Sequence, residues 1–193
     1  MVGQIDKSKH SLFLVRHGEC EMNLFLDGFV GGRASDSPLT AKGVDQAKTL
    51  GAYLQKLFAA RGIAPSDVRF YSSTAVRAID TAKIAMSELA VDAARLVSTD
   101  ELLELDMGEF AGKPRAEIYT KERLDEIGRD VWNFKPPGGE SQREVEERVM
   151  RVIDEIKDTH ESGVSLVVYH GLAIKCTLRH LLDSRPEMSR KIE

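Results

Sequence analysis

Two histidines in this sequence each follow an apolar run and precede a glycine. His17 lies in LVRHGEC (residues 14–20), and His170 lies in VVYHGLAIK (residues 167–175). A neutral imidazole can attack a phosphorus atom through one ring nitrogen when its other nitrogen is held as a hydrogen-bond donor. His17 is therefore a candidate nucleophile that would form a phosphohistidine, and His170 is a candidate hydrogen-bond donor beside it.

Two arginines supply the positive charge that this chemistry needs. A phosphoryl group in transfer carries negative charge on its equatorial oxygens, and catalysis consists mainly of positioning that group and stabilising the charge. Arg16 and Arg77 offer planar, permanently charged forks for those oxygens, and Asn23 can donate a further hydrogen bond. The sequence has no HxxEH pattern and no aspartate-rich ligand spacing. We therefore expect a reaction that uses no metal and no other cofactor.

The elements that must position these residues follow from the apolar patterns. Short, β-branched runs predict buried strands at residues 11–15, 68–72 and 164–169. Apolar residues at three- and four-residue spacing predict helices, two of them with clear N-caps at Thr40 and Ser141. These helices cover about residues 40–60, 73–89, 141–156 and 172–182. Strands that alternate with helices predict an α/β fold with a mostly parallel central sheet.

The polar candidates lie where the predicted strands end. Residues 16–17 end the first strand, residues 72–73 the second and residues 170–171 the third. In open parallel sheets, ligands bind in the crevice outside the carboxyl ends of the strands. We therefore expect these side chains to converge on one site.

The sequence around these residues resembles the histidine phosphatase superfamily, which includes the cofactor-dependent phosphoglycerate mutases and many small phosphatases. LVRHGECEMN is similar to the family signature RHGE-(T/S)-x-x-N. Five further blocks follow in the family's order, and together they span most of residues 11–175: SDSPLTAKGVDQA (35–47), YSSTAVRAIDTA (71–82), LLELDMGEFAGK (102–113), PGGESQREVEERV (137–149) and VVYHGLAIK (167–175).

The resemblance implies a fold and a set of roles. The fold would be a three-layer α/β/α sandwich of the phosphoglycerate mutase-like type, and residues 1–193 would form a single domain with a flexible segment at 1–10. Glu104 stands in the position of the family's general acid, although Glu101 and Glu109 are nearby alternatives. The implied catalytic residues are His17, Glu104 and His170. The implied phosphate-binding residues are Arg16, Asn23, Arg77 and Gly171.

Several features depart from the family pattern. Cys20 stands where the family has Thr or Ser, and Tyr169 stands where a small residue precedes the second histidine, so either residue could reshape the rim of the pocket. The segment that follows Asn23 is long, which leaves open whether Arg33 reaches the phosphate. The family continues past the position of Glu193. Either the C-terminal part of the family domain is missing here, or the C-terminal rim of the site is minimal.

Composition narrows the classes of partner. The 193 residues carry a formal net charge of −4, whereas a general nucleic-acid binder needs a basic face. The apolar stretches are too short to span a membrane, and the N-terminal residues lack the apolar core of a signal peptide. We expect a cytoplasmic protein that binds a small phosphorylated substrate, neither nucleic acid nor membrane, and that is either a monomer or a homodimer.

Three functions fit the motifs. A phosphatase that hydrolyses a small phosphomonoester without a metal is favoured, because the interval between Glu104 and His170 is short for a mutase. The alternatives are a cofactor-dependent phosphoglycerate mutase and a non-catalytic phosphate-binding or scaffold protein. Substrate selection would fall to residues 113–139. Their aromatic residues could face a substrate or cover the core, and core cover is the favoured interpretation.

Overall fold

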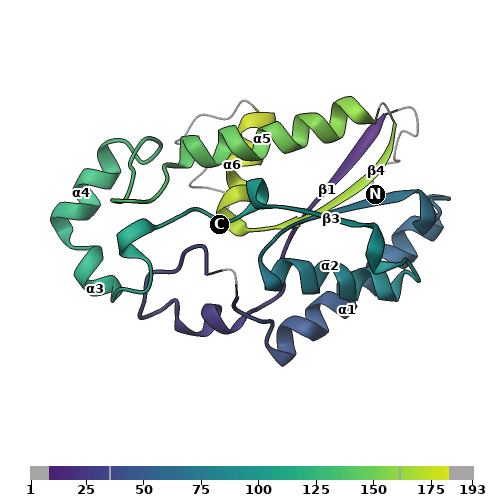
Figure 1. Cartoon of the computed structure of the whole chain (residues 1–193), viewed down its shortest axis with the longest axis horizontal. Helices are drawn as coiled ribbons and strands as arrows, with labels where there is room; N and C mark the ends of the chain where they lie inside the picture. Colours follow the sequence, from purple (N-terminus) through teal and green to yellow (C-terminus); the bar gives the residue numbers. More distant parts are fainter. Residues whose placement is uncertain (1–8, 35, 161, 183–193) are drawn as a thin grey trace.

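The computed structural model describes residues 9–34, 36–160 and 162–182, and its centre is a parallel sheet (Figure 1). Its strands are β1 (His10–Arg16), β2 (Val68–Ser73), β3 (Leu96–Thr99) and β4 (Gly163–Tyr169), in the order β1-β4-β2-β3. Every pairing between them is parallel. The predicted α/β class and parallel sheet are confirmed.

Helices cover both faces of this sheet and form a three-layer sandwich (Figure 1). One layer contains α1 (Ala41–Ala60) and α2 (Val76–Glu88), and the opposite layer contains α5 (Gln142–Thr159) and α6 (Gly171–Leu181). No described helix is long and apolar enough to cross a membrane.

The alternation of side chains along β4 divides the core in two. Leu166 and Val168 pack with Phe58 of α1 and the other apolar residues of that layer, whereas Val167 packs with Ile153 of α5. Successive strand residues point to opposite faces of a sheet, so the continuous apolar run in β4 supplies both layers. Burying each such side chain contributes about 1.5–3 kcal/mol.

The four predicted helices are present, with one displaced start. Thr40 and Ser141 cap α1 and α5 as predicted, and Ser141 and Glu144 form the capping box. α2 begins at Val76 and not near Ser73, because Ser72 and Ser73 continue the ladder of β2 against β3 and β4.

Three parts of the fold lay outside the sequence prediction. β3 is a four-residue edge strand whose burial is incomplete, so it lacks the apolar run that marks a central strand. The chain between Asp100 and Glu140 forms short 3-10 turns with α3 (Arg115–Ile118) and α4 (Lys121–Arg129). The expected flexible segment 1–10 ends in β1, because His10 is the first residue of that strand, and residues 1–8 are outside the described residues. The C-terminal rim beyond residue 182 is also outside the described residues.

Two glycines bring α1 against the segment that follows β1. A Cβ on Gly43 would lie 1.9 Å from the carbonyl oxygen of Glu19, and a Cβ on Gly18 would lie 2.6 Å from the carbonyl oxygen of Gly43. Real side-chain carbons do not approach backbone oxygens this closely. Only glycine at both positions lets the helix start here, directly beside His17.

Candidate active site

The predicted convergence of strand ends is present in the structure. His17 follows β1, Ser73 ends β2, and His170 follows β4 at the start of α6. The rings of His17 and His170 lie edge to face with their centroids 5.1 Å apart. Three consecutive neighbours in the sheet thus bring their polar ends to one place.

The hydrogen bonds of His17 leave one ring nitrogen available for attack. Nδ1 lies 2.7 Å from the carbonyl oxygen of Gly18, so Nδ1 carries the proton and donates it there. Nε2 then has a free lone pair and accepts a long hydrogen bond of 3.3 Å from Nε of Arg77. Burial, against the opposing bond to Gly18 and together with the charges of Arg77 and Arg16, lowers the pKa of His17 to about 4. The imidazole is therefore neutral at physiological pH.

His170 is fully buried and is also neutral. Its Nε2 lies 2.8 Å from the hydroxyl oxygen of Ser73, and its Nδ1 lies 3.3 Å from Nη2 of Arg77. Because Arg77 can only donate, Nδ1 is the unprotonated nitrogen and Nε2–H donates to Ser73. Burial lowers the pKa of His170 to about 2, and the charge of Arg77 contributes to the shift.

Arg77 connects the two histidines from the first turn of α2. It is 2% exposed, and its third contact is a hydrogen bond from Nη1 to the carbonyl oxygen of Ala34. The side chain therefore presents a guanidinium at the point where His17 would hold a phosphoryl group.

Arg16 and Gly171, two of the predicted phosphate-binding residues, lie next to each other. A Cβ on Gly171 would lie 3.5 Å from Nε of Arg16, so the arginine side chain passes over the start of α6 at van der Waals distance. Arg16 is exposed, and its guanidinium forms no hydrogen bond or ion pair with any other residue within 9–34, 36–160 and 162–182. The fork is thus available to an anion, beside the backbone N–H groups of a helix N-terminus.

Asn23 is oriented by its own turn. Its side-chain oxygen accepts from the backbone N–H of Cys20 at 3.0 Å and from the Cys20 thiol at 3.2 Å. Asn23 lines a pocket of about 600 Å³ together with Arg16 and His17, and its amide nitrogen is the group that could donate to a phosphate. Cys20 is buried under this turn, and Tyr169 is buried in the core with its hydroxyl donating to Thr177, so neither forms the pocket rim.

The Glu104 carboxyl group lies at the start of α6, the helix for which His170 is the N-cap. One carboxylate oxygen accepts from the backbone N–H of Leu105 at 2.9 Å, and the other accepts from the backbone N–H of Leu172 at 3.2 Å. Leu172 is only two residues from His170, so the carboxyl group lies across the first turn of α6. Glu101 instead pairs with Arg151 at an exposed position, and Glu109 is exposed. Of the three acidic candidates, Glu104 is the one held beside the histidines.

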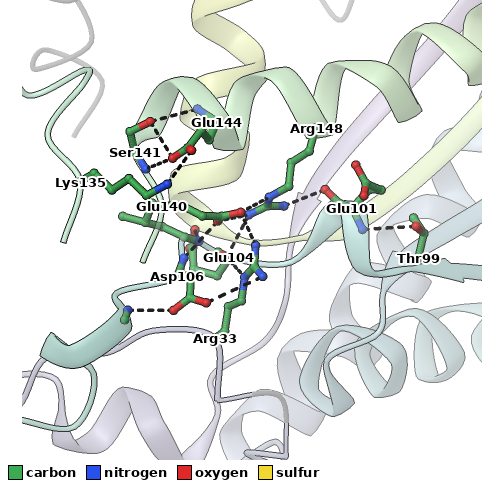
Figure 2. A network of polar contacts seen from close by, with 12 residues as sticks. Arg33, Thr99, Glu101, Glu104, Asp106, Lys135, Glu140, Ser141, Glu144 and Arg148 are labelled. Carbon is green, nitrogen blue, oxygen red and sulfur yellow. Dashed lines mark hydrogen bonds and ion pairs between the residues drawn. The ribbon is translucent and has the colours of Figure 1, made fainter. Parts of the chain in front are cut away.

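A cluster of charged residues surrounds the backbone of Glu104 and was not predicted from the sequence (Figure 2). Arg33 donates from Nε to the carbonyl oxygen of Glu104 at 3.0 Å, and Arg148 donates from Nη2 to the same oxygen at 3.0 Å. Glu140 pairs with both arginines. Arg33 therefore binds the segment that contains Glu104, and it forms no hydrogen bond or ion pair with His17 or Arg77. The available signal was Arg148, a charged residue on the apolar stripe of its helix between Val145 and Val149.

The hydroxyl groups of Ser73 and Thr81 form hydrogen bonds with His170 and with the backbone of Gly18 and Arg77. Besides the bond from Ser73 to His170, the backbone N–H of Gly18 donates to the Thr81 hydroxyl at 3.0 Å, and that hydroxyl donates to the carbonyl oxygen of Arg77 at 2.7 Å. The described residues contain no group of three or more His, Cys, Asp or Glu side chains that could hold a metal ion.

Two aromatic residues of the predicted specificity segment contact arginine side chains. Trp132 packs against the α5 and α6 side of the core, where the guanidinium of Arg179 lies over its ring. Tyr119 lies under Arg115 at the end of α3. Lys113 and Arg115 are exposed. Core cover, the favoured interpretation, is confirmed for Trp132.

Comparison with known proteins agrees with the geometry. The family model described as "Histidine phosphatase superfamily (branch 1)" matches residues 12–193. The chain is 33% identical over 186 residues to a 2,3-bisphosphoglycerate-dependent phosphoglycerate mutase of Azorhizobium caulinodans, covering 94% of this chain and 86% of the relative.

Solved structures share the fold. A protein of Escherichia coli provisionally named an alpha-ribazole-5'-P phosphatase superposes with a TM-score of 0.74 at 25% identity, over 93% of this chain and 83% of that one. A mycobacterial glucosyl-3-phosphoglycerate phosphatase superposes with a TM-score of 0.76 at 23% identity, over 94% of this chain and 84% of that one. The chain is a phosphoglycerate mutase-like enzyme acting on phosphoesters, and it belongs to branch 1 of the histidine phosphatase superfamily.

Proposed function

We propose that the protein is a phosphatase that hydrolyses a small phosphomonoester through a phosphohistidine on Nε2 of His17, without a metal. The observation that carries the proposal is the state of His17: Nδ1–H is bound to the carbonyl of Gly18 while Nε2 is unprotonated and faces Arg77. A nucleophile with a free lone pair beside a buried cation is suited to attack on a dianionic phosphoryl group.

In the first half-reaction, the Nε2 lone pair forms the N–P bond as the P–O ester bond breaks. The electron pair of that bond goes to the leaving oxygen, which takes a proton from the carboxylic acid form of Glu104. Arg16, Arg77, Asn23 and the N–H groups at Gly171 would bind the phosphoryl oxygens, and His170 would border the same position. The product is the free alcohol.

In the second half-reaction, water attacks phosphorus and the N–P bond breaks. The electron pair returns to Nε2 of His17, Glu104 takes a proton from the water, and inorganic phosphate is released. The starting protonation states are restored, so the cycle balances without another reactant.

A phosphatase must admit water to the phosphohistidine, whereas a mutase must keep water away from it. His17 is partly exposed and lines a pocket of about 600 Å³ together with the exposed Arg16 and Asp27. This access supports hydrolysis, as does the likeness to the E. coli protein provisionally named a phosphatase. The similarity to the Azorhizobium enzyme keeps a cofactor-dependent phosphoglycerate mutase as the second candidate.

The test measures inorganic phosphate released from sugar phosphates, phosphoglycerates and p-nitrophenyl phosphate in the presence of EDTA, with wild type and His17→Ala. We expect release that survives EDTA and is lost in the variant. Transfer of phosphate between phosphoglycerates that depends on a bisphosphoglycerate primer, without comparable hydrolysis, would identify a mutase. Binding of phosphorylated ligands with neither reaction would identify a non-catalytic phosphate-binding or scaffold protein.

A further inference from the structure

Glu104 lies in a stretch that no helix or strand holds in place. The 3-10 turn Asp100–Leu102 ends before it, the turn Gly108–Phe110 begins after it, and residues 103–107 have no regular secondary structure. A general acid must nevertheless meet the leaving oxygen at hydrogen-bond distance. The position of Glu104 must therefore be fixed by other contacts.

Two guanidinium groups supply those contacts at one backbone atom. The carbonyl oxygen of Glu104 accepts from Nε of Arg33 and from Nη2 of Arg148, each at 3.0 Å. Arg148 reaches it from α5, and Arg33 reaches it from the loop that precedes α1 (Figure 2). Arg148 also donates from Nη1 to the carbonyl oxygen of Glu101 at 2.7 Å. Hydrogen bonds from charged donors are about twice as strong as those between neutral groups.

Glu140 makes this arrangement of like charges possible. Its Oε1 accepts from Nη2 of Arg33 at 2.6 Å and from Nε of Arg148 at 3.1 Å, and its Oε2 accepts from Nη2 of Arg148 at 3.0 Å. Burial alone would raise the pKa of Glu140, but hydrogen bonding and charge from Arg148, together with the N–H of Asp106 and the charge of Arg33, lower it below its ordinary value. Glu140 is thus the charged counter-ion of both arginines.

The same carboxylate also holds the chain on the far side of Glu104. Oε2 of Glu140 accepts from the backbone N–H of Asp106 at 3.2 Å, and the backbone N–H of Glu140 donates to the carbonyl oxygen of Asp106 at 2.9 Å. Glu140 therefore holds Asp106 directly and holds Glu104 through the two arginines. Arg148 and Glu140 have side chains only 7% and 19% exposed, so solvent screens these contacts little.

The loop that carries Arg33 also contacts Arg77, through the residue after Arg33. The next residue, Ala34, accepts a hydrogen bond from Nη1 of Arg77 through its carbonyl oxygen. Two adjacent residues of one loop thus contact the backbone of Glu104 and the guanidinium of Arg77. The distance between proton donor and phosphate site is set partly by this dipeptide.

We infer that Arg33, Glu140 and Arg148 are positioning residues that hold the Glu104 carboxyl group where it protonates the leaving oxygen. The inference rests on the proposed function. In this view the cluster contributes to the P–O cleavage step only through Glu104, and its importance grows as the leaving group becomes more basic. A role in folding alone would affect all substrates alike.

The test compares phenyl phosphate with p-nitrophenyl phosphate, two esters of similar shape. The p-nitrophenolate ion leaves without a proton, whereas the phenolate ion, from a phenol of pKa about 10, needs one. We expect Glu140→Gln to lower kcat/KM for phenyl phosphate about tenfold, part of the roughly 10²–10⁴ that a general acid contributes, and to lower it for p-nitrophenyl phosphate less than about twofold. A series of substituted phenyl phosphates should then give a steeper dependence of kcat/KM on leaving-group pKa.

Two further variants complete the design. Glu144→Gln is the matched control, because Glu144 lies in the first turn of α5, pairs with Lys135 and not with the cluster, and can be replaced by glutamine in a capping box. This variant should leave the leaving-group dependence unchanged. Arg33→Lys replaces a partly exposed residue of the cluster, so it serves as the test if Glu140→Gln does not fold. It should lower kcat/KM for phenyl phosphate more than for p-nitrophenyl phosphate, by a smaller factor than Glu140→Gln.

The outcomes separate this inference from the function beneath it. Equal losses on both substrates, or no loss on either, in a folded Glu140→Gln and in Arg33→Lys would overturn the positioning role while wild-type hydrolysis stands. Failure of the wild type to hydrolyse either ester in a manner that depends on His17 would overturn the proposed function and the inference with it.

Discussion

The rings of His17 and His170 face each other edge to face at 5.1 Å between centroids, and neither carries a charge at neutral pH. Two imidazolium groups this close would repel each other and the arginine between them. Arg77 donates to the unprotonated nitrogen of each ring. Two neutral imidazoles therefore flank the buried guanidinium of Arg77.

Replacing Arg77 with lysine should lower kcat/KM about 10²–10³-fold, the usual result of removing one donor from a charge-stabilising site. Lysine keeps the positive charge but lacks the planar fork that reaches both histidines at once. The measurement is phosphate release by purified Arg77→Lys with unfolding monitored in parallel. A variant with near wild-type kcat/KM would show that charge alone is sufficient here.

The ring protons of His17 should not titrate between about pH 5 and pH 8, the range in which an ordinary histidine titrates. Burial and the nearby arginines lower its pKa to about 4. NMR of histidine-labelled protein, assigned with His17→Ala, would measure the midpoint. A midpoint near 6.5 would mean that the nucleophile is partly protonated at neutral pH.

Stability should fall as the pH is lowered below about 6.5, the ordinary pKa of histidine. The lowered pKa values of His17 and His170 mean that the unfolded chain binds more protons than the folded one in this range, so the free energy of unfolding decreases with decreasing pH. The loss from His17 is complete below about pH 4, and that from His170 continues toward about pH 2. Urea unfolding of wild type and His170→Asn across this range would measure it, with a shallower slope expected for the variant.

Ser73→Ala should lower the free energy of unfolding by about 1–3 kcal/mol, because it leaves the buried Nε2–H of His170 without an acceptor. Ser72→Ala on the same strand is the matched control. The hydroxyl of Ser72 pairs with that of Ser98, an exposed residue that can turn to water instead. Chemical denaturation should therefore show a clearly smaller loss for Ser72→Ala, and equal losses would contradict the assigned hydrogen bond.

The sequence predicted the central strands and the residues that end them because both signals are local. The apolar run of β4 is followed at once by His170, and LVRHGEC ends β1 in the same way. The contacts that orient Glu104 could not be predicted, because Arg33, Glu140 and Arg148 are all distant in sequence from it, and Arg33 is distant from the other two. Arg33 and Glu140 belong to residue types that are usually exposed, and only Arg148, on the apolar stripe of α5, gave a local signal. The edge strand β3 was missed for a related reason: its residues are half exposed and its partner is supplied only by the folded sheet.

Gly43→Ala should destabilise the protein by about 1–3 kcal/mol or more, as overpacking at a rigid contact does. The added Cβ would lie 1.9 Å from the carbonyl oxygen of Glu19, and neither α1 nor the segment after β1 has a flexible side chain there that can yield. Because Glu19 follows Gly18, whose carbonyl holds Nδ1 of His17, a shift of this segment should also reduce kcat/KM. Gly128→Ala in α4 is the control, since nothing lies within 4 Å of its Cβ position, and alanine there should stabilise the helix by up to about 1 kcal/mol. Thermal unfolding should therefore show a lower melting temperature for Gly43→Ala and an equal or higher one for Gly128→Ala. Phosphate release should fall only in Gly43→Ala. Unchanged activity in that variant would mean that the contact with α1 does not determine the position of His17.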